Sequence, residues 1–435
     1  MKKSNIIILI SALLVFTSCL FEQKDIFDKT PAERMEGYLK EYQELLESSE
    51  NGWILEYYPD SYLSYGGYVY FLTFNEGEVS VQFQMAADVS KEITSLYKMT
   101  PDDGPILSFD TYNAYLHYFA TPSSGEANYQ GKRGDTEFKI MGKSDDESEI
   151  YLVGRKSGNP CKLVRNDEYD ATEYLTACNA IKNELNYKTI VSFEFQVGDA
   201  KGEAERGGEM ELSNYFYFGY PEDGVMDSED EILIEGEFPF CTTPDGIKLF
   251  KPVEIDGTEY DYFYYDGENN RFITEDEYVS INMTYTPISQ QFAGAEWYIT
   301  KENLSPAVAA IFAEVETTLA SSSDAIEYIA FGTGLSGSKK YGLEFQCTKG
   351  KGTFEYKTNV KADDKLGLKY TMTNDGDAKT YLTKLLKLID CFGRSAEKTF
   401  TVETDNFKLP TWIKLTDASN TAISIKFVKD KVAYN

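Results

Sequence analysis

Histidine is almost absent from this chain of 435 residues, which contains only His117. A hydrolytic triad needs a base beside its nucleophile, and a catalytic zinc site needs several nitrogen or sulfur ligands. The sequence also lacks a Gly-x-Ser-x-Gly elbow, a phosphate-binding Gly-x-x-x-x-Gly-Lys loop and any Cys-x-x-Cys pair. The alternating stretch YLHYF at residues 115–119 predicts a strand in which His117 is structural. We therefore predict no catalytic residue, and a protein that is not an enzyme.

Basic residues are scarce beside acidic ones, with 42 Lys and Arg against 72 Asp and Glu and a formal net charge of −30. Such a surface repels nucleic-acid phosphates and anionic lipid head groups. We expect no nucleic-acid partner and interpret the acidity as a source of solubility. A carboxylate-dependent glycosidase stays an alternative, because the fold rather than the local sequence would bring its two carboxylates together.

Long apolar runs are missing except near the N-terminus. Residues 6–16 are apolar apart from Ser11 and follow two lysines, but they are fewer than the about 20 residues of a membrane-spanning helix. This pattern predicts a signal peptide over residues 1–18. The run ends in FTSC, which resembles the bacterial lipobox, whose cysteine thiol takes a diacylglycerol and becomes the new N-terminus. The resemblance implies a lipid on Cys19 and a tether over residues 19–29; a secreted protein with an incidental cysteine is the alternative. The acidic residues Glu22, Asp25 and Asp28 of that tether favour an outer-membrane location facing the cell exterior.

Metal-binding signatures are also lacking. Five cysteines follow Cys19, an odd number without zinc-site spacing, and we interpret them as small buried apolar residues. The spacing leaves a Cys161–Cys178 bridge open without predicting it. One acidic loop could hold calcium, which prefers oxygen ligands, although its spacing does not match an EF-hand and a solvated turn is the simpler interpretation. Its acidic residues are Asp223, Asp227, Glu229 and Asp230. No cofactor is predicted otherwise.

Tyrosine and phenylalanine are abundant, with 33 and 27 residues, a composition typical of strands. Thr30-Pro31-Ala32-Glu33 forms a capping box that predicts an amphipathic helix over residues 31–50. Alternating apolar residues then predict hairpins over residues 68–83, 105–120 and 137–153.

A second strand-rich region begins after a helix predicted at residues 170–185, and a third mixes strands with helices predicted at 306–320 and 378–392. The predicted fold class is therefore mainly β with α+β character: antiparallel meanders forming a sandwich or small barrel, a leading amphipathic helix and a C-terminal α+β part. The predicted domains are residues 30–166 (helix plus antiparallel β), 167–290 (a second β-rich domain) and 291–435 (α+β).

Several short motifs follow the lipobox in a recognisable order: NGW at 51–53, YYP at 57–59, GYVYF at 67–71 and GPILSFDTYN at 104–113. Together they resemble a family of uncharacterised surface lipoproteins of the Bacteroidota that carries a domain of unknown function. Its members are typically encoded beside an uptake pair of the SusC/SusD type, that is, a TonB-dependent transporter and a SusD-like lipoprotein. The resemblance implies an accessory role in nutrient capture. It transfers no site residue, since none is established for the family.

Aromatic residues are the remaining candidates for ligand contact, because a ring face can stack on the apolar face of a sugar and buried rings anchor protein partners. The candidates are Trp53, Trp297, Trp412 and the run at residues 260–265, for which sheet packing is the simpler interpretation. The leading hypothesis is a non-catalytic, lipid-anchored binding or scaffold component of an outer-membrane uptake system. The alternatives are the glycosidase and a structural surface adhesin.

Overall fold

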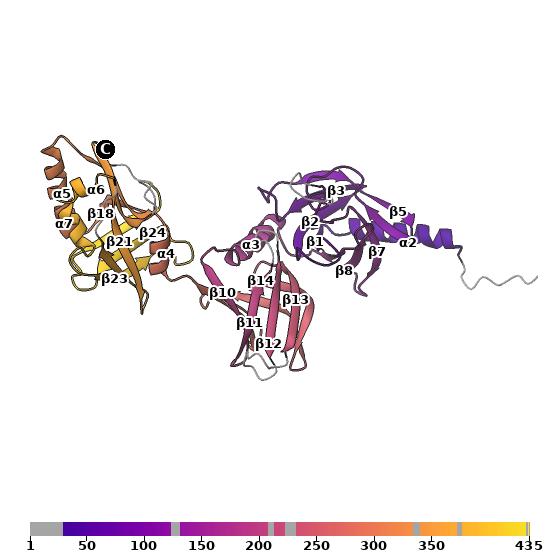
Figure 1. Cartoon of the computed structure of the whole chain (residues 1–435). Coiled ribbons are helices and arrows are strands. Elements are labelled where there is room, and N and C mark those ends of the chain that lie inside the picture. The colour runs from indigo at the N-terminus through magenta and orange to yellow at the C-terminus, as the bar shows by residue number, and fades with distance from the viewer. Residues whose placement is uncertain are drawn as a thin grey trace, which may run out of the picture. The chain divides into compact units, whose positions relative to one another are not determined.

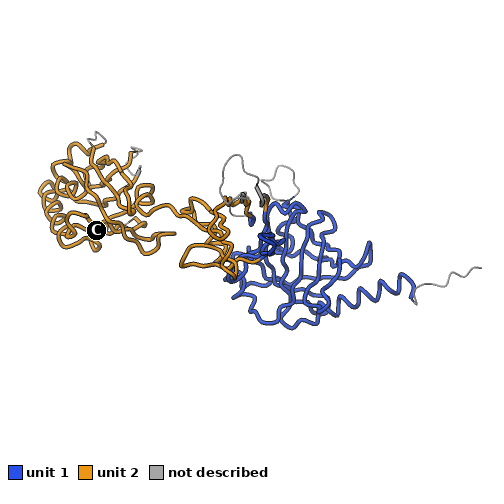
Figure 2. The backbone as a smooth tube through the Cα atoms, turned by 90° about the horizontal axis from the view of Figure 1, so that it is seen from below, with its two compact units in different colours: residues 1–180, 212–215, 238–261 blue, residues 181–211, 216–237, 262–435 orange. Residues whose placement is uncertain are grey.

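The computed structural model describes residues 29–122, 131–207, 213–221, 232–333, 340–371, 376–431 and 434. The fold is mainly antiparallel β, with three sheets and a few helices, which confirms the predicted fold class (Figure 1). The chain divides into two compact units (Figure 2). Unit 1 comprises residues 1–180, 212–215 and 238–261, and unit 2 comprises residues 181–211, 216–237 and 262–435.

The first sheet has nine antiparallel strands. In spatial order they are β4 (Ile93–Leu96), β3 (Glu78–Phe83), β2 (Tyr68–Asn75), β1 (Trp53–Tyr57), β9 (Pro160–Arg165), β8 (Glu149–Gly154), β7 (Glu137–Lys143), β6 (Gly104–Ser108) and β5 (Lys98–Asp102). The predicted hairpins at 68–83 and 137–153 are confirmed as β2–β3 and β7–β8.

Helix α2 (Pro31–Glu47) begins at the predicted capping box. Glu33 N donates to Thr30 Oγ1 at 3.3 Å, and Thr30 N donates to Glu33 Oε2 at 2.8 Å, so each residue satisfies an amide of the other. The helix ends three residues before the predicted end at residue 50. Leu46 is buried in the core of the first sheet, and its carbonyl accepts from Trp53 Nε1 at 2.9 Å.

The side chains of strand β1 show which face of the first sheet is turned toward the core. Trp53, Leu55 and Tyr57 point into the core of the first sheet. Because side chains alternate along a strand, Glu56 and Tyr58 point to the opposite, outer face. The same alternation holds on the neighbouring strand β9, and it places Lys162 beside Glu56 on that outer face.

The predicted hairpin at residues 105–120 is wrong in its second half. Only β6 forms there, and the described residues 109–122 are turns and irregular segments rather than a strand. The buried side chain of Asn113 accounts for the difference. Its Oδ1 accepts from the amides of Tyr115 and Leu116, and its Nδ2 donates to Ile93 O and Ser95 Oγ. These side-chain bonds offer the backbone an alternative to a sheet ladder.

The second sheet is a closed antiparallel barrel that follows helix α3 (Ala171–Glu184). Its strands are β10 (Ile190–Val197), β11 (Ala200–Arg206), β12 (Tyr215–Pro221), β13 (Ile232–Thr242), β14 (Gly246–Ile255), β15 (Thr258–Asp266), β16 (Arg271–Ile273) and β17 (Val279–Tyr285). Strand β14 belongs to unit 1, and this strand supplies one wall of the site described below.

The third sheet is also a closed barrel, and it follows helix α4 (Ile288–Gly294). Its strands are β18 (Trp297–Leu304), β19 (Ile326–Thr333), β20 (Tyr341–Cys347), β21 (Gly350–Lys361), β22 (Lys365–Tyr370), β23 (Lys398–Thr404), β24 (Trp412–Asp417) and β25 (Ser424–Val428). Helix α5 (Pro306–Ala320) matches its prediction. The helix predicted at 378–392 is instead two short ones, α6 (Ala378–Tyr381) and α7 (Leu386–Cys391).

All five cysteines after residue 19 are buried and unpaired, so the bridge between Cys161 and Cys178 does not form. This confirms the interpretation of these residues as small buried groups. Within the described residues, no helix is both long and apolar enough to cross a bilayer.

Candidate functional site: a charged groove in unit 1

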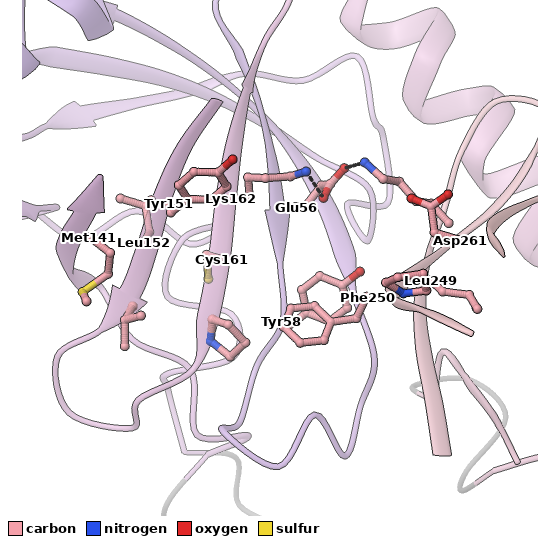
Figure 3. A pocket seen from close by; sticks show the side chains of 14 residues that line it. Glu56, Tyr58, Met141, Tyr151, Leu152, Cys161, Lys162, Leu249, Phe250 and Asp261 are labelled. Atoms are coloured by element: carbon pink, nitrogen blue, oxygen red, sulfur yellow. Dashed lines mark hydrogen bonds and ion pairs between the residues drawn. The ribbon is translucent and has the colours of Figure 1, made fainter. Parts of the chain in front are cut away.

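A groove with a cavity volume of about 430 Å³ lies in unit 1, over the outer face of the first sheet (Figure 3). Strands β1, β7, β8 and β9 supply one side of it, and residues 248–252 of β14 with Asp261 of β15 supply the other. The volume falls in the range of roughly 300–1,000 Å³ that is typical of small-molecule sites.

Strand register places three polar side chains in one row across the floor of the groove. Glu56 on β1 lies directly opposite Lys162 on β9. Lys162 in turn lies opposite Tyr151 on β8. Directly paired residues on one face of an antiparallel sheet have Cβ atoms about 4.5–5.5 Å apart, so the three side chains are neighbours.

The β14 wall is joined to the first sheet by a tight backbone contact that involves two glycines. Gly66, at φ +66°, forms a parallel bridge with Asn214. The amide of Gly67 donates to Phe240 O at 2.9 Å, and Asn214 Nδ2 donates to Gly67 O at 2.8 Å. Residues 240–242 pair with the start of β14, so this contact sets the position of Lys248.

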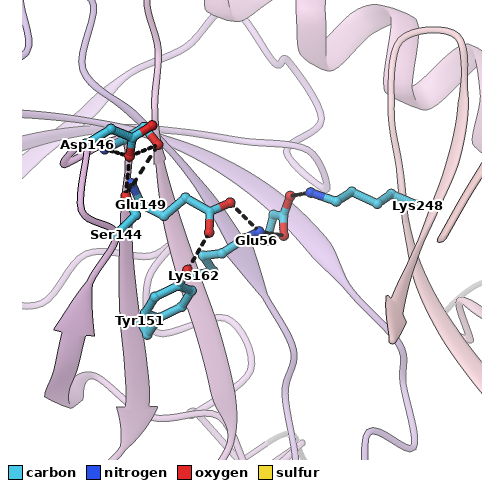
Figure 4. A network of polar contacts seen from close by, with 8 residues as sticks. Glu56, Ser144, Asp146, Glu149, Tyr151, Lys162 and Lys248 are labelled. Atoms are coloured by element: carbon cyan, nitrogen blue, oxygen red, sulfur yellow. Dashed lines mark hydrogen bonds and ion pairs between the residues drawn. The ribbon is translucent and has the colours of Figure 1, made fainter. Parts of the chain in front are cut away.

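The charged side chains form an alternating chain along the groove (Figure 4). Lys248 Nζ contacts Glu56 Oε1 at 3.0 Å, and Lys162 Nζ lies 3.6 Å from Glu56 Oε2. Lys162 Nζ also donates to Glu149 Oε1 at 2.7 Å, and Tyr151 OH donates to Glu149 Oε2 at 2.8 Å. From Lys248 to Glu149 the side chains thus alternate between positive and negative charge. This row of charged side chains, the charge chain, ends at the phenol of Tyr151.

Partial burial and mutual attraction together set the protonation states of these charged side chains. Burial disfavours the ammonium of Lys162, but Glu56 and Glu149 outweigh it and raise its pKa above the usual lysine value. Burial likewise disfavours the carboxylate of Glu149, but Lys162 and Tyr151 outweigh it and lower its pKa. Both groups are therefore charged at neutral pH.

Aromatic and apolar groups line the rest of the groove. The rings of Tyr58 and Phe250 pack together with centroids 4.8 Å apart. At the β7–β8 side, Met141 and Tyr151 are 60% and 42% exposed, so the groove is open to solvent there. Cys161 also borders the groove, but burial raises the pKa of its thiol well above the usual range, which leaves it protonated and a poor nucleophile.

A family model described as "Domain of unknown function (DUF4302)" matches residues 23–267. The match covers more than half of the chain. The chain belongs to this family. All the residues that line the groove lie inside the match, whereas the third barrel lies outside it. The groove is therefore part of the DUF4302 region.

Other comparisons add nothing to this DUF4302 assignment. No curated protein matches the chain. Among solved structures, a DNA polymerase III beta chain from Streptococcus pneumoniae TIGR4 has 11% identity, covers 92% of this chain and 98% of its own, and gives a TM-score of 0.11. The beta subunit of a Streptococcus pyogenes DNA polymerase gives the same identity and TM-score, with 88% and 91% covered. At these scores neither likeness carries an argument.

Of the residues singled out in the sequence, Cys161 and Asp261 of the run at 260–265 line this groove, whereas His117 and the three tryptophans do not. His117 lies in the turn region after β6, where its ring packs 5.0 Å from that of Tyr112. Trp53 and Trp297 are buried in two different cores, and Trp412 is half-buried beneath Lys426. Trp53 and Trp297 are 0% and 1% exposed and cannot stack on a ligand, so for these two residues sheet packing, the simpler interpretation, holds.

The aromatic run at 260–265 is confirmed as a strand, β15, whose alternate residues face opposite ways. Phe263 is fully buried, while the rings of Tyr262 and Tyr264 pack together 4.7 Å apart on the other face. Cys19 and the acidic loop with Asp223, Asp227, Glu229 and Asp230 lie outside the described residues. In the part of the chain that is described, no group of three His, Cys, Asp or Glu side chains could hold a metal ion.

One glycine pattern, which begins at the end of β19, has the spacing of a nucleotide-binding motif. Residues 332–337 read GTGLSG, which has the Gly-x-Gly-x-x-Gly spacing of a dinucleotide fingerprint. That fingerprint needs a strand followed by a helix in a βαβ unit. Here the flanking strands β19 and β20 are antiparallel neighbours. The spacing therefore indicates no nucleotide site.

Replacing Lys162 by Met should lower the free energy of unfolding by about 1–3 kcal/mol at pH 7, because Glu149 loses its ammonium partner. The folded pKa of Glu149 is lowered, so its contribution is complete above the unfolded value of about 4.3 and is lost as the pH falls below it. The folded pKa of Lys162 is raised, so its contribution is complete below about 10.4 and is lost at higher pH.

The difference between the wild type and Lys162→Met should thus be largest between these pH values, as measured by denaturant unfolding. Lys201→Met is the matched control, since Lys201 pairs with Glu194 at 2.8 Å but is 64% exposed. Its cost should stay below about 0.5 kcal/mol. An equal effect of the two substitutions at pH 7 would contradict a structural role for the charge chain.

Proposed function

We propose that the chain is a non-catalytic, lipid-anchored binding component of a cell-surface nutrient-uptake system, and that the groove of unit 1 holds its ligand. The observation that carries the proposal is the state of the reactive groups in the groove and of Glu149, which lies beside it. Glu56 is paired with two lysines, Glu149 with Lys162 and Tyr151, and the thiol of Cys161 is protonated. Among the described lining residues there is no histidine. These groups suit binding and orientation better than proton transfer or nucleophilic attack.

The cellular setting is supported by the sequence. The lipobox-like FTSC motif supports lipidation of Cys19, and the acidic tether that follows it supports an outer-membrane location facing the exterior. The motif order between residues 51 and 113 supports a place among surface lipoproteins of the Bacteroidota. The proposed partners are a TonB-dependent transporter and a SusD-like lipoprotein, with no nucleic acid and no cofactor.

An affinity pull-down of the tagged, full-length protein from gently solubilised membranes tests this setting. We expect a TonB-dependent transporter and its SusD-like partner to be recovered with it. A Cys19→Ala variant lacks the proposed lipidation site and therefore its membrane anchor, so it should recover neither protein. Recovery of the wild-type protein alone would remove the uptake role and favour a free-standing adhesin or enzyme.

A carboxylate-dependent glycosidase is the second candidate, because Glu56 and Asp261 both line the groove. Such an enzyme uses one carboxylic acid as a proton donor and one carboxylate as a nucleophile or base. Both oxygens of Glu56 already face an ammonium group, an arrangement that favours a structural role for this residue. Loss of glycan cleavage in a Glu56→Gln variant, from a wild type that cleaves, would reverse this preference.

A further inference from the structure

We infer that the groove binds an uncharged, polyhydroxylated ligand, namely one or two rings of an oligosaccharide. The inference rests on the proposed function, because it names the ligand of the same groove. Three properties carry it: the alternation of charge along the groove, the exposed ring beside that chain, and the absence of a free strand edge on its floor.

The charged residues that line the groove, Lys248, Lys162, Glu56 and Asp261, together have no net charge. Three of them alternate in sign along a row of ion pairs, Lys248–Glu56–Lys162, which continues to Glu149 beside the groove. An ionic ligand placed on it would meet a group of its own sign beside each group of opposite sign. A hydroxyl group, in contrast, both donates and accepts, so it can accept from an ammonium and donate to the neighbouring carboxylate. Two adjacent hydroxyls of a sugar ring match this alternation.

The charged groups of this row can make more hydrogen bonds than their ion pairs use. An ammonium has three N–H donors and a carboxylate has about four acceptor positions. Lys248, Glu56 and Lys162 are each partly exposed, at 28%, 17% and 22% of their side chains. They are therefore held in place by each other yet remain accessible to a ligand. An apolar ligand would bury these charges without replacing their contacts with water, which is costly.

The apolar part of the groove provides a surface for the carbon side of a sugar ring. Tyr151 is 42% exposed, and its hydroxyl is held by Glu149, which fixes the ring beside Lys162 (Figure 4). Met141 lies on the same open side (Figure 3). A fixed aromatic face beside a polar row suits a pyranose, which has an apolar C–H face and a rim of hydroxyls. The volume of about 430 Å³ suits one or two such rings.

An extended peptide fits the groove less well. Peptides commonly bind by adding a strand to a free sheet edge. The floor here is the face of β1, β9 and β8, whose backbone groups are already paired with neighbouring strands on both sides. A peptide would thus find side chains but no backbone ladder to extend.

Saturation-transfer NMR of the full-length lipidated protein tests the inference, in a detergent without a sugar head group. The probes are neutral oligosaccharides of two to six sugars, oligosaccharides of the same size with uronic acids, and unstructured peptides. We expect a neutral oligosaccharide to bind, Tyr151→Ala to weaken it about tenfold, and Tyr151→Phe to keep most of the affinity, since the ring remains. Tyr264, 40% exposed and outside the groove, gives the matched control Tyr264→Ala, which should bind as the wild type does.

The outcomes separate this inference from the proposed function. Tyr151-dependent binding of a uronate or a peptide, without a neutral sugar, would overturn the ligand class and leave a binding role in place. Binding of no probe would also overturn the ligand class, and the pull-down would then decide the uptake role separately. A neutral oligosaccharide that binds equally to Tyr151→Ala would place the site elsewhere. The melting temperature of each variant confirms that it is folded.

Discussion

Gly66→Ala should lower the free energy of unfolding by about 2–5 kcal/mol and abolish ligand binding in the groove. Gly66 has φ +66°, and a methyl group there would lie 1.9 Å from the carbonyl oxygen of Asn214. A left-handed conformation costs a non-glycine residue roughly 1–2 kcal/mol, and overpacking adds about 1–3 kcal/mol. Since the obstacle is backbone, relief requires the Asn214 segment to move away. Residues 240–242 would move with it, and so would Lys248, which pairs with Cys241.

Gly77→Ala is the matched control for this prediction. Gly77 lies in the β2–β3 turn with φ +84°, but a methyl group there would meet nothing within 4 Å. It should therefore cost only the conformational penalty of about 1–2 kcal/mol and leave binding unchanged. Denaturant unfolding and ligand titration of both variants measure the difference. If the two substitutions cost the same, the contact at Gly66 does not hold the groove wall.

Cys19→Ala should move the protein almost completely from the membrane fraction to the soluble fraction of the cell or to the medium. Each buried acyl methylene contributes about 0.8 kcal/mol, so several chains on one cysteine anchor a protein stably and their loss releases it. Membrane fractionation with immunoblotting, together with fatty-acid labelling, measures the effect.

Cys178→Ala controls for the loss of a cysteine as such. Cys178 is fully buried in helix α3, so the thiol is out of reach of a lipid-transferring enzyme. This variant should remain in the membrane fraction and keep its fatty-acid label. A Cys19→Ala protein that stays in the membrane fraction would show that something other than a lipid on residue 19 holds it there.

Local signals in the sequence were sufficient for some elements of the fold. The capping box at Thr30 and Glu33 satisfies its own amides, so it predicts the start of α2 without the rest of the protein. Strands β2 and β3 alternate on either side of a turn at Glu76 and Gly77, both at positive φ, so their hairpin is also determined locally. These predictions needed no contact between distant residues.

Distant contacts explain the errors. Asn113 bonds to Ile93 and Ser95, about twenty positions away, and these bonds hold residues 113–116 in a turn although their pattern alternates like a strand. In α6, Tyr381 OH donates to the buried carboxylate of Asp324, which fixes this turn separately from α7. Neither partner can be read from the neighbouring sequence.

The groove could be predicted only in part. A signal was present in β1, where Glu56 interrupts the apolar run WILEYY, and in β9, where Lys162 stands between Cys161 and Leu163. Each charge suggests an outward-facing position on a half-buried strand. Their partner Lys248 is 192 positions from Glu56, on a strand of a different sheet. Only the fold brings these charges together.

The central claim is that the groove binds its ligand and releases it unchanged. The measurement that tests it most directly is mass spectrometry of a bound oligosaccharide after prolonged incubation with the wild type, Tyr151→Ala and Glu56→Gln. We predict that the wild type retains the ligand and returns it intact, and that Tyr151→Ala retains little. Glu56→Gln should return the ligand intact as well. Cleaved ligand from the wild type and intact ligand from Glu56→Gln would contradict the claim and identify the groove as an active site.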